Sequence, residues 1–214
     1  YLFQNYSIKG IQKEVILLQP NVDPYTEKYA QSNAEVIVGL LEQTQEKITP
    51  NTQFVIAPET VLAENTPYEN FQYSVGNGLL HRFIYQHPKV SFLLGIDTYD
   101  ILYNKALTNP ASNQVEENIW VNFYNSALFI NQSNSIQKYN KSKLVVGVEN
   151  LPYKPFFEPL LKNYMIDLGG TMSTKTTQQE RSVFTDKDGT KIAPIICYES
   201  VYGEYVTGYA KNKA

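Results

Sequence analysis

The chain has 214 residues and a mass of 24.4 kDa, the size of one globular domain with a substantial core. It is 43% hydrophobic and 18% charged, which excludes a disordered chain, and no apolar run approaches the roughly 20 residues of a membrane-spanning helix. The net charge of −3 excludes the basic surface expected of a nucleic-acid-binding protein. One cysteine and two histidines exclude a disulfide framework and most zinc sites, and no glycine-rich phosphate loop is present, so we expect neither a metal nor a cofactor.

The N-terminal half alternates between predicted strands and predicted helices. Short apolar runs predict strands at residues 12–19, 54–57 and 90–96, and helical spacing of apolar residues predicts helices at residues 29–48 and 69–86. Continuous apolar runs of this kind are typical of strands covered on both faces. The alternation predicts a parallel or mixed sheet with helical layers, and therefore an α/β fold.

The C-terminal half is less regular. It begins with a long polar loop that has room for a hairpin (97–118), followed by a strand pair around a polar turn (119–130 and 135–139). An irregular stretch with an aromatic helical face follows (151–179). The chain then continues with a hairpin that turns at Asp188-Gly189 (181–185 and 191–197) and a helix (201–213). No internal repeat and no domain boundary is visible. We therefore expect residues 1–214 to form a single domain.

Cys197 lies between an apolar strand and the last predicted helix. A thiol at a helix N-terminus has a lowered pKa, and the nearby backbone N–H groups can stabilise an oxyanion. The alternative is a small, buried structural cysteine. The two histidines, His81 and His87, lie in or just after the second predicted helix rather than at a strand end, so we do not expect a Cys–His dyad.

Glu59 and Lys141 each follow a predicted strand and could act together with Cys197. Glu59 follows the strand at 54–57, at the edge of the sheet where ligands of α/β folds bind. It is therefore a better candidate for the general base than either histidine. Lys141 follows the strand at 135–139. Taken alone, Glu59 is better explained as an ordinary glutamate at the start of a helix or loop, and Lys141 as a solvated surface charge.

Five motifs occur together in the order typical of the nitrilase superfamily. They are PET at 58–60, FYNSALFI at 123–130, YNKSKLV at 139–145, Glu149 with Pro152, and IICYES at 195–200. The chain resembles that superfamily over nearly its whole length, which implies a nitrilase-like four-layer α-β-β-α sandwich. Within the superfamily it is most similar to the apolipoprotein N-acyltransferase branch, because of YNSA, the glutamate eight residues after Lys141, and QPNVDPYTEKY at 19–29.

The resemblance implies a Glu–Lys–Cys triad. Glu59 would be the general base, Cys197 the nucleophile and Lys141 the cationic stabiliser of the tetrahedral intermediate. The backbone N–H of Tyr198 would complete the oxyanion site, since one such donor typically contributes about 3–4 kcal/mol to lowering the barrier.

Glu149 and Glu199 are second candidates for the site. Glu199 follows Cys197 by two residues and could orient Lys141. For both glutamates a structural salt bridge is as good an explanation as a role in the chemistry. The role of Glu149 is less well defined, since VGVE at 146–149 replaces the P-F-G-E usual in the branch.

The resemblance also implies an activity: transfer of a fatty acyl chain from a phospholipid to the N-terminal amine of a diacylglyceryl-cysteine lipoprotein, through a thioester on Cys197. The partners would be a phospholipid donor, a lipidated apolipoprotein acceptor and the membrane, with no nucleic acid. The expected place is the periplasmic, outer face of a bacterial cytoplasmic (inner) membrane. Two alternatives stay open: a soluble amidase or nitrilase acting on a small C–N substrate, and a non-catalytic lipoprotein-binding domain.

The chain differs from complete members of the branch at both ends. It ends at Ala214, before the further strands usual in nitrilase-type domains, and it lacks the branch's N-terminal membrane helices. We therefore expect the extramembrane part of a longer membrane protein, with the second sheet of the sandwich lacking its C-terminal strands.

Overall fold

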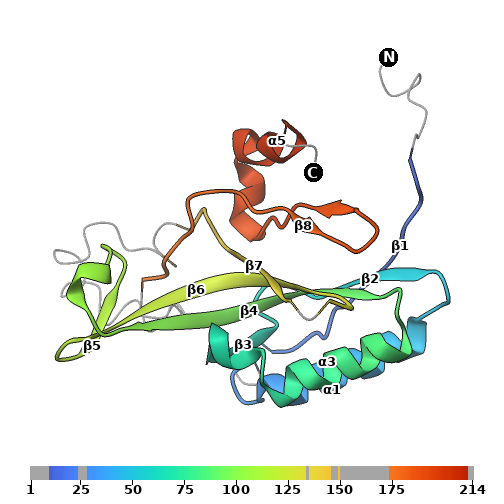
Figure 1. Cartoon of the computed structure of the whole chain (residues 1–214), viewed down its shortest axis with the longest axis horizontal. Coiled ribbons are helices and arrows are strands. Elements are labelled where there is room, and N and C mark those ends of the chain that lie inside the picture. Colours follow the sequence, from blue (N-terminus) through green and yellow to red (C-terminus); the bar gives the residue numbers. More distant parts are fainter. Residues whose placement is uncertain (1–9, 24–27, 134, 146–148, 150–173, 212–214) are drawn as a thin grey trace.

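A computed structural model of the chain describes residues 10–23, 28–133, 135–145, 149 and 174–211. The aromatic helical face predicted within the stretch 151–179 lies outside the described residues, which include only 174–179 of that stretch. The described residues form an α/β structure built around one large sheet (Figure 1). No helix in the described part is both long and apolar enough to cross a membrane.

The large sheet has seven strands of mixed direction. In chain order they are β1 (Glu14–Leu17), β2 (Thr52–Ile56), β3 (Leu62–Pro67), β4 (Ser91–Leu102), β5 (Asn113–Glu116), β6 (Ile119–Ile130) and β7 (Gln137–Asn140). The spatial order is β1-β2-β4-β6-β5, with β3 also pairing with β4 and β7 with β6. Strands β1 to β4 pair in parallel, whereas β6 runs antiparallel to β4, β5 and β7. The predicted mixed sheet and the predicted antiparallel strand pair are therefore confirmed.

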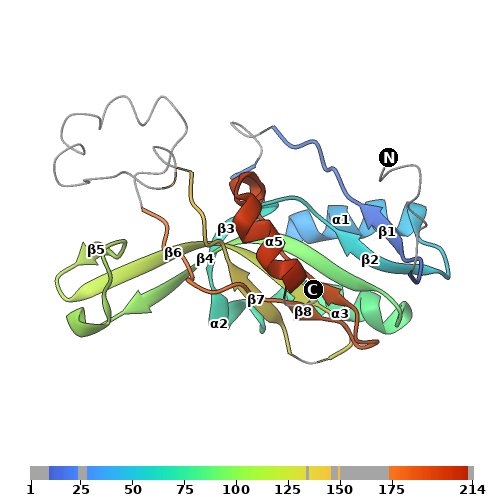
Figure 2. The same ribbon diagram turned by 90° about the horizontal axis from the view of Figure 1, so that it is seen from above.

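Helices α1 (Asn33–Lys47) and α3 (Val75–Gln86) cover one face of the sheet (Figures 1 and 2). The main core lies between them and the strands, where Ile37, Leu80 and Phe92 are fully buried. Burying an aliphatic or aromatic side chain of this size contributes about 1.5–3 kcal/mol, so this layer accounts for much of the stability.

The other face carries the hairpin β8 (Phe184–Thr185) and β9 (Lys191–Ile192), with α5 (Gly203–Lys211) outside it (Figure 1). Phe184 stacks on Phe129 of β6 with ring centroids 5.7 Å apart, and the hydroxyl of Ser91 donates a 2.8 Å hydrogen bond to the buried Asp186 carboxylate. Tyr209 of α5 donates a 3.0 Å hydrogen bond to the carbonyl of Pro194. The layers therefore follow in the order helix, sheet, sheet, helix, with the second sheet reduced to two short strands in the described residues.

Three sequence predictions need correction. The predicted helix at 69–86 is two helices, α2 (Tyr68–Phe71) and α3, because the hydroxyl of Ser74 caps a new helix by accepting a hydrogen bond from the Asn77 N–H. Strand β1 is not covered on both faces: it is an edge strand, and the Leu17 side chain is exposed. Much of the predicted loop 97–118 is sheet, because β4 continues to Leu102 and pairs with β6 along its whole length.

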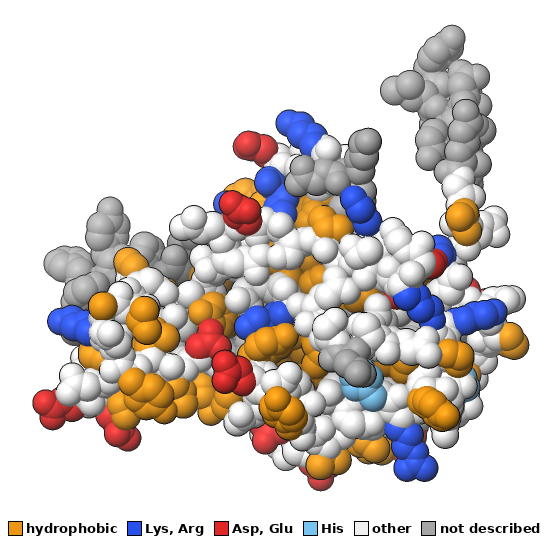
Figure 3. All heavy atoms as spheres, viewed as in Figure 1, with side chains coloured by type: hydrophobic (Ala, Val, Ile, Leu, Met, Phe, Trp, Pro, Cys, Tyr) orange, Lys and Arg blue, Asp and Glu red, His pale blue; other side chains and the backbone are white. Residues whose placement is uncertain are grey.

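One end of the molecule presents apolar side chains to solvent. The outer parts of β4 and β6, together with β5 and the short helix η2 (Lys105–Leu107), project beyond the layer of helices (Figure 1). Hydrophobic side chains gather on this end in the space-filling view (Figure 3). Exposed members of the group are Ile101, Tyr103, Leu107 and Val115.

Candidate active site

Glu59 is brought to the edge of the sheet by a tight crossing of the chain over β4. After β2, the segment Pro58-Glu59-Thr60 lies directly against Gly95, where an added Cβ atom would come within 2.5 Å of the Pro58 carbonyl oxygen. Thr60 takes a left-handed backbone conformation with φ of 46°. Gly95 is therefore required for Glu59 to reach its position, since any larger residue would push the segment away from the strand.

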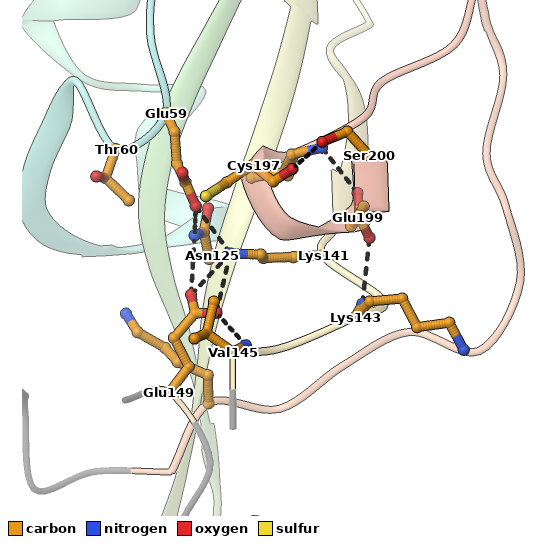
Figure 4. A network of polar contacts seen from close by, with 12 residues as sticks. Glu59, Thr60, Asn125, Lys141, Lys143, Val145, Glu149, Cys197, Glu199 and Ser200 are labelled. Carbon is orange, nitrogen blue, oxygen red and sulfur yellow. Dashed lines mark hydrogen bonds and ion pairs between the residues drawn. The ribbon is translucent and has the colours of Figure 1, made fainter. Parts of the chain in front are cut away.

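Lys141 lies in the middle of the site, at the end of β7. Its side chain is only 1% exposed, and its ammonium donates hydrogen bonds to Glu59 Oε1 at 2.9 Å and to Glu149 Oε2 at 2.9 Å (Figure 4). Burial acts to lower the pKa of Lys141, but the hydrogen bonds to Glu149 and Glu59 outweigh it and raise the pKa above the ordinary value. Lys141 is therefore a fixed positive charge between two carboxylates.

Asn125 is a member of this cluster that the sequence analysis missed. Its amide Nδ2 donates to Glu59 Oε1 at 2.5 Å and to Glu149 Oε1 at 3.3 Å, while its backbone carbonyl accepts a hydrogen bond from the Lys141 N–H. Its side-chain oxygen is buried and has no hydrogen-bond partner among the residues that the structure describes. The motif at 123–130 contained Asn125, but only the register of β6 against β4 and β7 shows that its side chain faces the glutamates.

Cys197 stands at the start of η3 (Cys197–Val201), with its sulfur pointing toward the carboxylate of Glu59 (Figure 4). Its φ of 47° is left-handed, which is rare for a residue with a side chain and places the sulfur on a sharp turn. Partial burial of the sulfur, and then the charge and hydrogen bond of Glu59, raise the pKa of the Cys197 thiol. The predicted lowering of that pKa by a helix N-terminus is therefore wrong: a short 3₁₀ helix follows, α5 begins only at Gly203, and the nearest charge is a carboxylate.

Tyr198 contributes through its backbone. Its N–H forms a hydrogen bond with Cys197 that acts, together with the charge of Lys141, to lower the thiol pKa against the larger effects of burial and Glu59. The Tyr198 ring packs edge-on against Tyr202, with centroids 5.4 Å apart. The N–H predicted for the oxyanion site therefore lies beside the sulfur, and the aromatic ring serves packing.

Glu149 holds Lys141 from the side opposite Glu59. Its carboxylate also accepts a 2.9 Å hydrogen bond from the Val145 N–H. Burial acts to raise the pKa of Glu149, but the Val145 N–H and Lys141 outweigh it and the pKa lies below the ordinary value. Glu149 is thus an ionised partner of Lys141, a role that the altered loop at 146–149 does not remove.

Glu199 is fully buried and does not face the Lys141 side chain. Its Oε1 accepts hydrogen bonds from the Ser142 N–H at 2.6 Å and the Tyr139 hydroxyl at 2.5 Å, and its Oε2 accepts one from the Ile196 N–H at 2.8 Å. These contacts tie the backbone after Lys141 to the backbone before Cys197. Glu199 therefore orients both residues through the main chain, rather than Lys141 directly as the sequence suggested.

Two cavities meet at Glu59. The smaller, about 170 Å³, reaches Cys197 and is lined mainly by apolar residues of the sheet and the 194–196 segment: Ile56, Ala57, Leu93, Leu94, Gly95, Ala127, Pro194, Ile195 and Ile196, with Ser126. The larger, about 500 Å³, lies on the side of Thr60 and has a mixed lining. Glu59 therefore lines both a mainly apolar cavity beside Cys197 and a wider, more polar one beside Thr60.

No described residues outside the cluster offer a histidine base or a metal centre. His87 follows α3, the helix on the face of the sheet opposite β8, and packs against Phe83. Within the described ranges no group of three Asp, Glu, His or Cys side chains could hold a metal ion. Lys141 supplies the positive charge between the two glutamates of the site.

The carbon-nitrogen hydrolase family profile matches residues 104–214, which include Lys141, Glu149 and Cys197. The chain belongs to the carbon-nitrogen hydrolase family. This confirms the nitrilase-superfamily resemblance and the α/β class expected from the sequence.

A solved structure of an amidase double mutant from Nesterenkonia sp. AN1, in complex with acrylamide, is similar over 98% of this chain and 65% of its own, with a TM-score of 0.51 and 12% identity. Another structure of that amidase aligns with 91% of this carbon-nitrogen hydrolase chain and 61% of its own, with a TM-score of 0.50 and 12% identity.

A curated relative is similar along the whole sequence. An apolipoprotein N-acyltransferase from Chlorobaculum tepidum is 26% identical over 228 residues, an alignment that covers 100% of this chain and 40% of the relative. The carbon-nitrogen hydrolase chain thus spans less than half the length of that relative.

Proposed function

We propose that this carbon-nitrogen hydrolase domain transfers a fatty acyl chain from a phospholipid to the N-terminal amine of a diacylglyceryl-cysteine lipoprotein. The observation that carries the proposal is the convergence of three side chains. The Cys197 sulfur points toward the Glu59 carboxylate in a cavity that both residues line, and Lys141 holds that carboxylate at 2.9 Å (Figure 4). The likeness to an apolipoprotein N-acyltransferase along the whole chain supports this substrate class.

The first half-reaction forms a thioester on Cys197. Because the pKa of the thiol is raised, the sulfur is protonated at neutral pH and needs a base. Glu59 accepts the proton while the sulfur attacks the ester carbonyl carbon of the donor. The Lys141 ammonium and the Tyr198 N–H stabilise the oxyanion, and the lysophospholipid leaves with the proton that Glu59 returns to its oxygen.

The second half-reaction moves the acyl chain to the acceptor. The α-amine attacks the thioester carbonyl and Glu59 takes a proton from the amine as the new amide bond forms. The C–S bond breaks, and the released thiolate regains its proton from Glu59. Neither step needs a metal or an oxidant, because only protons and the acyl group move.

The partners and the place follow from these substrates. The donor is a phospholipid, the acceptor is a lipidated apolipoprotein, and both lie in a membrane, so we place the reaction at the outer face of a bacterial cytoplasmic membrane. The small cavity beside Cys197, with its mainly apolar lining, suits the first part of an acyl chain.

Hydrolysis of a small amide is the second candidate function. It is supported by membership of the carbon-nitrogen hydrolase family and by the Glu59, Lys141 and Cys197 cluster, which could equally form a thioester from an amide and release it to water. The two candidates differ only in the donor and in what attacks the thioester.

The deciding experiment compares substrates in the full-length natural protein. We expect acylation of a synthetic diacylglyceryl-cysteine peptide from a phospholipid donor, followed by mass spectrometry, and no turnover of short amides such as butyramide. The Cys197→Ala variant should lose acylation and keep its melting temperature, because the residue as a whole is exposed and its sulfur is only partly buried. Turnover of short amides without peptide acylation would favour the amidase, and no turnover of either would favour a binding domain.

A further inference from the structure

A positively charged side chain that the chemistry above does not use lines the larger cavity beside Glu59. Lys28 lies half-buried on its wall, near Thr60. The cavity measures about 500 Å³, and its polar lining consists of Gln19, Asn21, Lys28, Gln31, Glu59 and Thr60.

Lys28 is held by a neutral partner and keeps donors available. Its ammonium donates a 2.6 Å hydrogen bond to the Thr60 hydroxyl. Across the described ranges, no carboxylate lies within ion-pair distance of Lys28. An ammonium has three N–H donors, and within the described residues only the bond to Thr60 uses one of them. The Thr60 hydroxyl can donate its own proton onward.

Asp97, an acid on which the charge of Lys28 acts, is already paired with another lysine. Asp97 is close enough for the charge of Lys28 to act on its pKa, but its carboxylate accepts a 3.0 Å hydrogen bond from buried Lys175. Glu59, the acid in the cavity lining, is paired with Lys141. Among the residues that the structure describes, Lys28 therefore has no carboxylate of its own, and its ammonium lies 5.9 Å from the centre of the Tyr29 ring.

The rest of the polar lining also suits an anion. Gln19, Asn21 and Gln31 contribute exposed side-chain amides at the cavity, and amide groups donate N–H bonds to oxygen. A lysine surrounded by neutral donors is a common way to bind a phosphate group. The smaller cavity, with Cys197, has no such cation in its lining.

We propose that Lys28 and Thr60 bind the phosphate group of the acyl donor, while its ester bond lies at Cys197. In Figure 4, Glu59 lies between Thr60 and Cys197, and Glu59 lines both cavities. A glycerophospholipid has its phosphate and its ester carbonyls separated by only a few bonds of glycerol, which suits two cavities that share a lining residue. This inference rests on the proposed function and adds the part of the donor that the protein recognises.

The test compares a donor with a phosphate and one without. Steady-state kinetics of the full-length natural protein are measured with phosphatidylglycerol and with p-nitrophenyl palmitate, a neutral ester. Lys28→Gln should raise KM for phosphatidylglycerol about tenfold or more, because a charge-assisted hydrogen bond is lost. It should leave kcat/KM for the neutral ester within about twofold, because catalysis at Cys197 is untouched.

Two control variants define the effect. Lys28→Arg should restore most of the affinity for phosphatidylglycerol, since the charge and donors remain. Lys47→Gln, at the exposed C-terminal end of α1, removes the same charge outside the cavity and should behave like the wild type.

Three outcomes overturn the inference. The first is an unchanged KM for phosphatidylglycerol in Lys28→Gln, and the second is an equal loss with both esters, which would place Lys28 in the support of the catalytic centre. The third is that inorganic phosphate inhibits neutral-ester turnover by the wild type but not by Lys28→Gln, while the variant's KM for phosphatidylglycerol is unchanged. The cavity would then be a site for free phosphate. Failure of the proposed function is seen separately, because the wild-type protein itself would then not use phosphatidylglycerol.

Discussion

Two clusters of residues built around glutamates support the candidate active site. They differ in how many hydrogen bonds already occupy their carboxylate oxygens. The open cluster consists of Glu59, Glu149, Lys141 and Asn125; the Glu59 side chain is 30% exposed there and faces the Cys197 thiol. In the closed cluster, Glu199 is fully buried, and backbone N–H groups and a tyrosine hydroxyl occupy both of its oxygens. A carboxylate saturated by backbone donors fixes the main chain, whereas one held by a lysine with an oxygen toward a thiol can move protons.

The largest expected effect comes from the open cluster. Glu59→Gln should reduce acyl transfer about 10³-fold, since general base catalysis contributes about 10²–10⁴-fold, and it should change the free energy of unfolding by less than about 1 kcal/mol. Stopped assays with the lipopeptide acceptor and urea unfolding measure the two quantities. Glu42→Gln, an exposed position in α1, is the matched control. Activity near that of the wild type would remove Glu59 from the chemistry.

The closed cluster should show the opposite pattern. Glu199→Gln places an NH₂ group against N–H donors and leaves buried groups unpaired, so we expect a loss of about 2–4 kcal/mol in the free energy of unfolding. Activity measured well below the melting temperature should fall far less than in Glu59→Gln. Glu204→Gln, exposed in the first turn of α5, serves as the control in urea unfolding. A fully stable but inactive Glu199→Gln protein would contradict the division between the clusters.

Asn125 tests how the open cluster is held in place. Asn125→Ala removes the amide that donates to both Glu59 and Glu149, and we expect kcat to fall about tenfold with KM little changed. The measurement is a kcat and KM comparison with the phospholipid donor. A rise in KM alone would show that Asn125 binds substrate instead of holding the carboxylates.

The pH dependence of thiol alkylation gives a smaller but specific signal. Burial and the negative charge of Glu59 raise the pKa of Cys197, so alkylation by iodoacetamide should be slow at neutral pH and should accelerate only above the ordinary thiol range. Glu59→Gln removes the charge and should move the alkylation profile to lower pH while transfer is lost. A profile that does not move would mean that Glu59 and the thiol are not in contact in solution.

Sequence patterns were sufficient for much of this account. Ordered motifs around Glu59, Lys141 and Cys197 indicated the family, and the structure brings the three residues together although Glu59 and Lys141 are 82 positions apart. Asn125 was missed because its role depends on strand register, which no local pattern contains. The fully buried position of Glu199 and the raised pKa of Cys197 were also missed, since both arise from neighbours far away in the chain.

The central claim is that Cys197 carries the acyl group, and intact-protein mass spectrometry tests it most directly. The full-length natural protein is incubated with a palmitoyl phospholipid in the absence of acceptor, then digested and mapped. We expect one palmitoyl group as a thioester on Cys197, removed by hydroxylamine or by the acceptor lipopeptide and absent in Glu59→Gln. A wild-type protein that acylates the lipopeptide while Cys197 never carries an acyl group, or an adduct that persists unchanged in Glu59→Gln, would contradict the account.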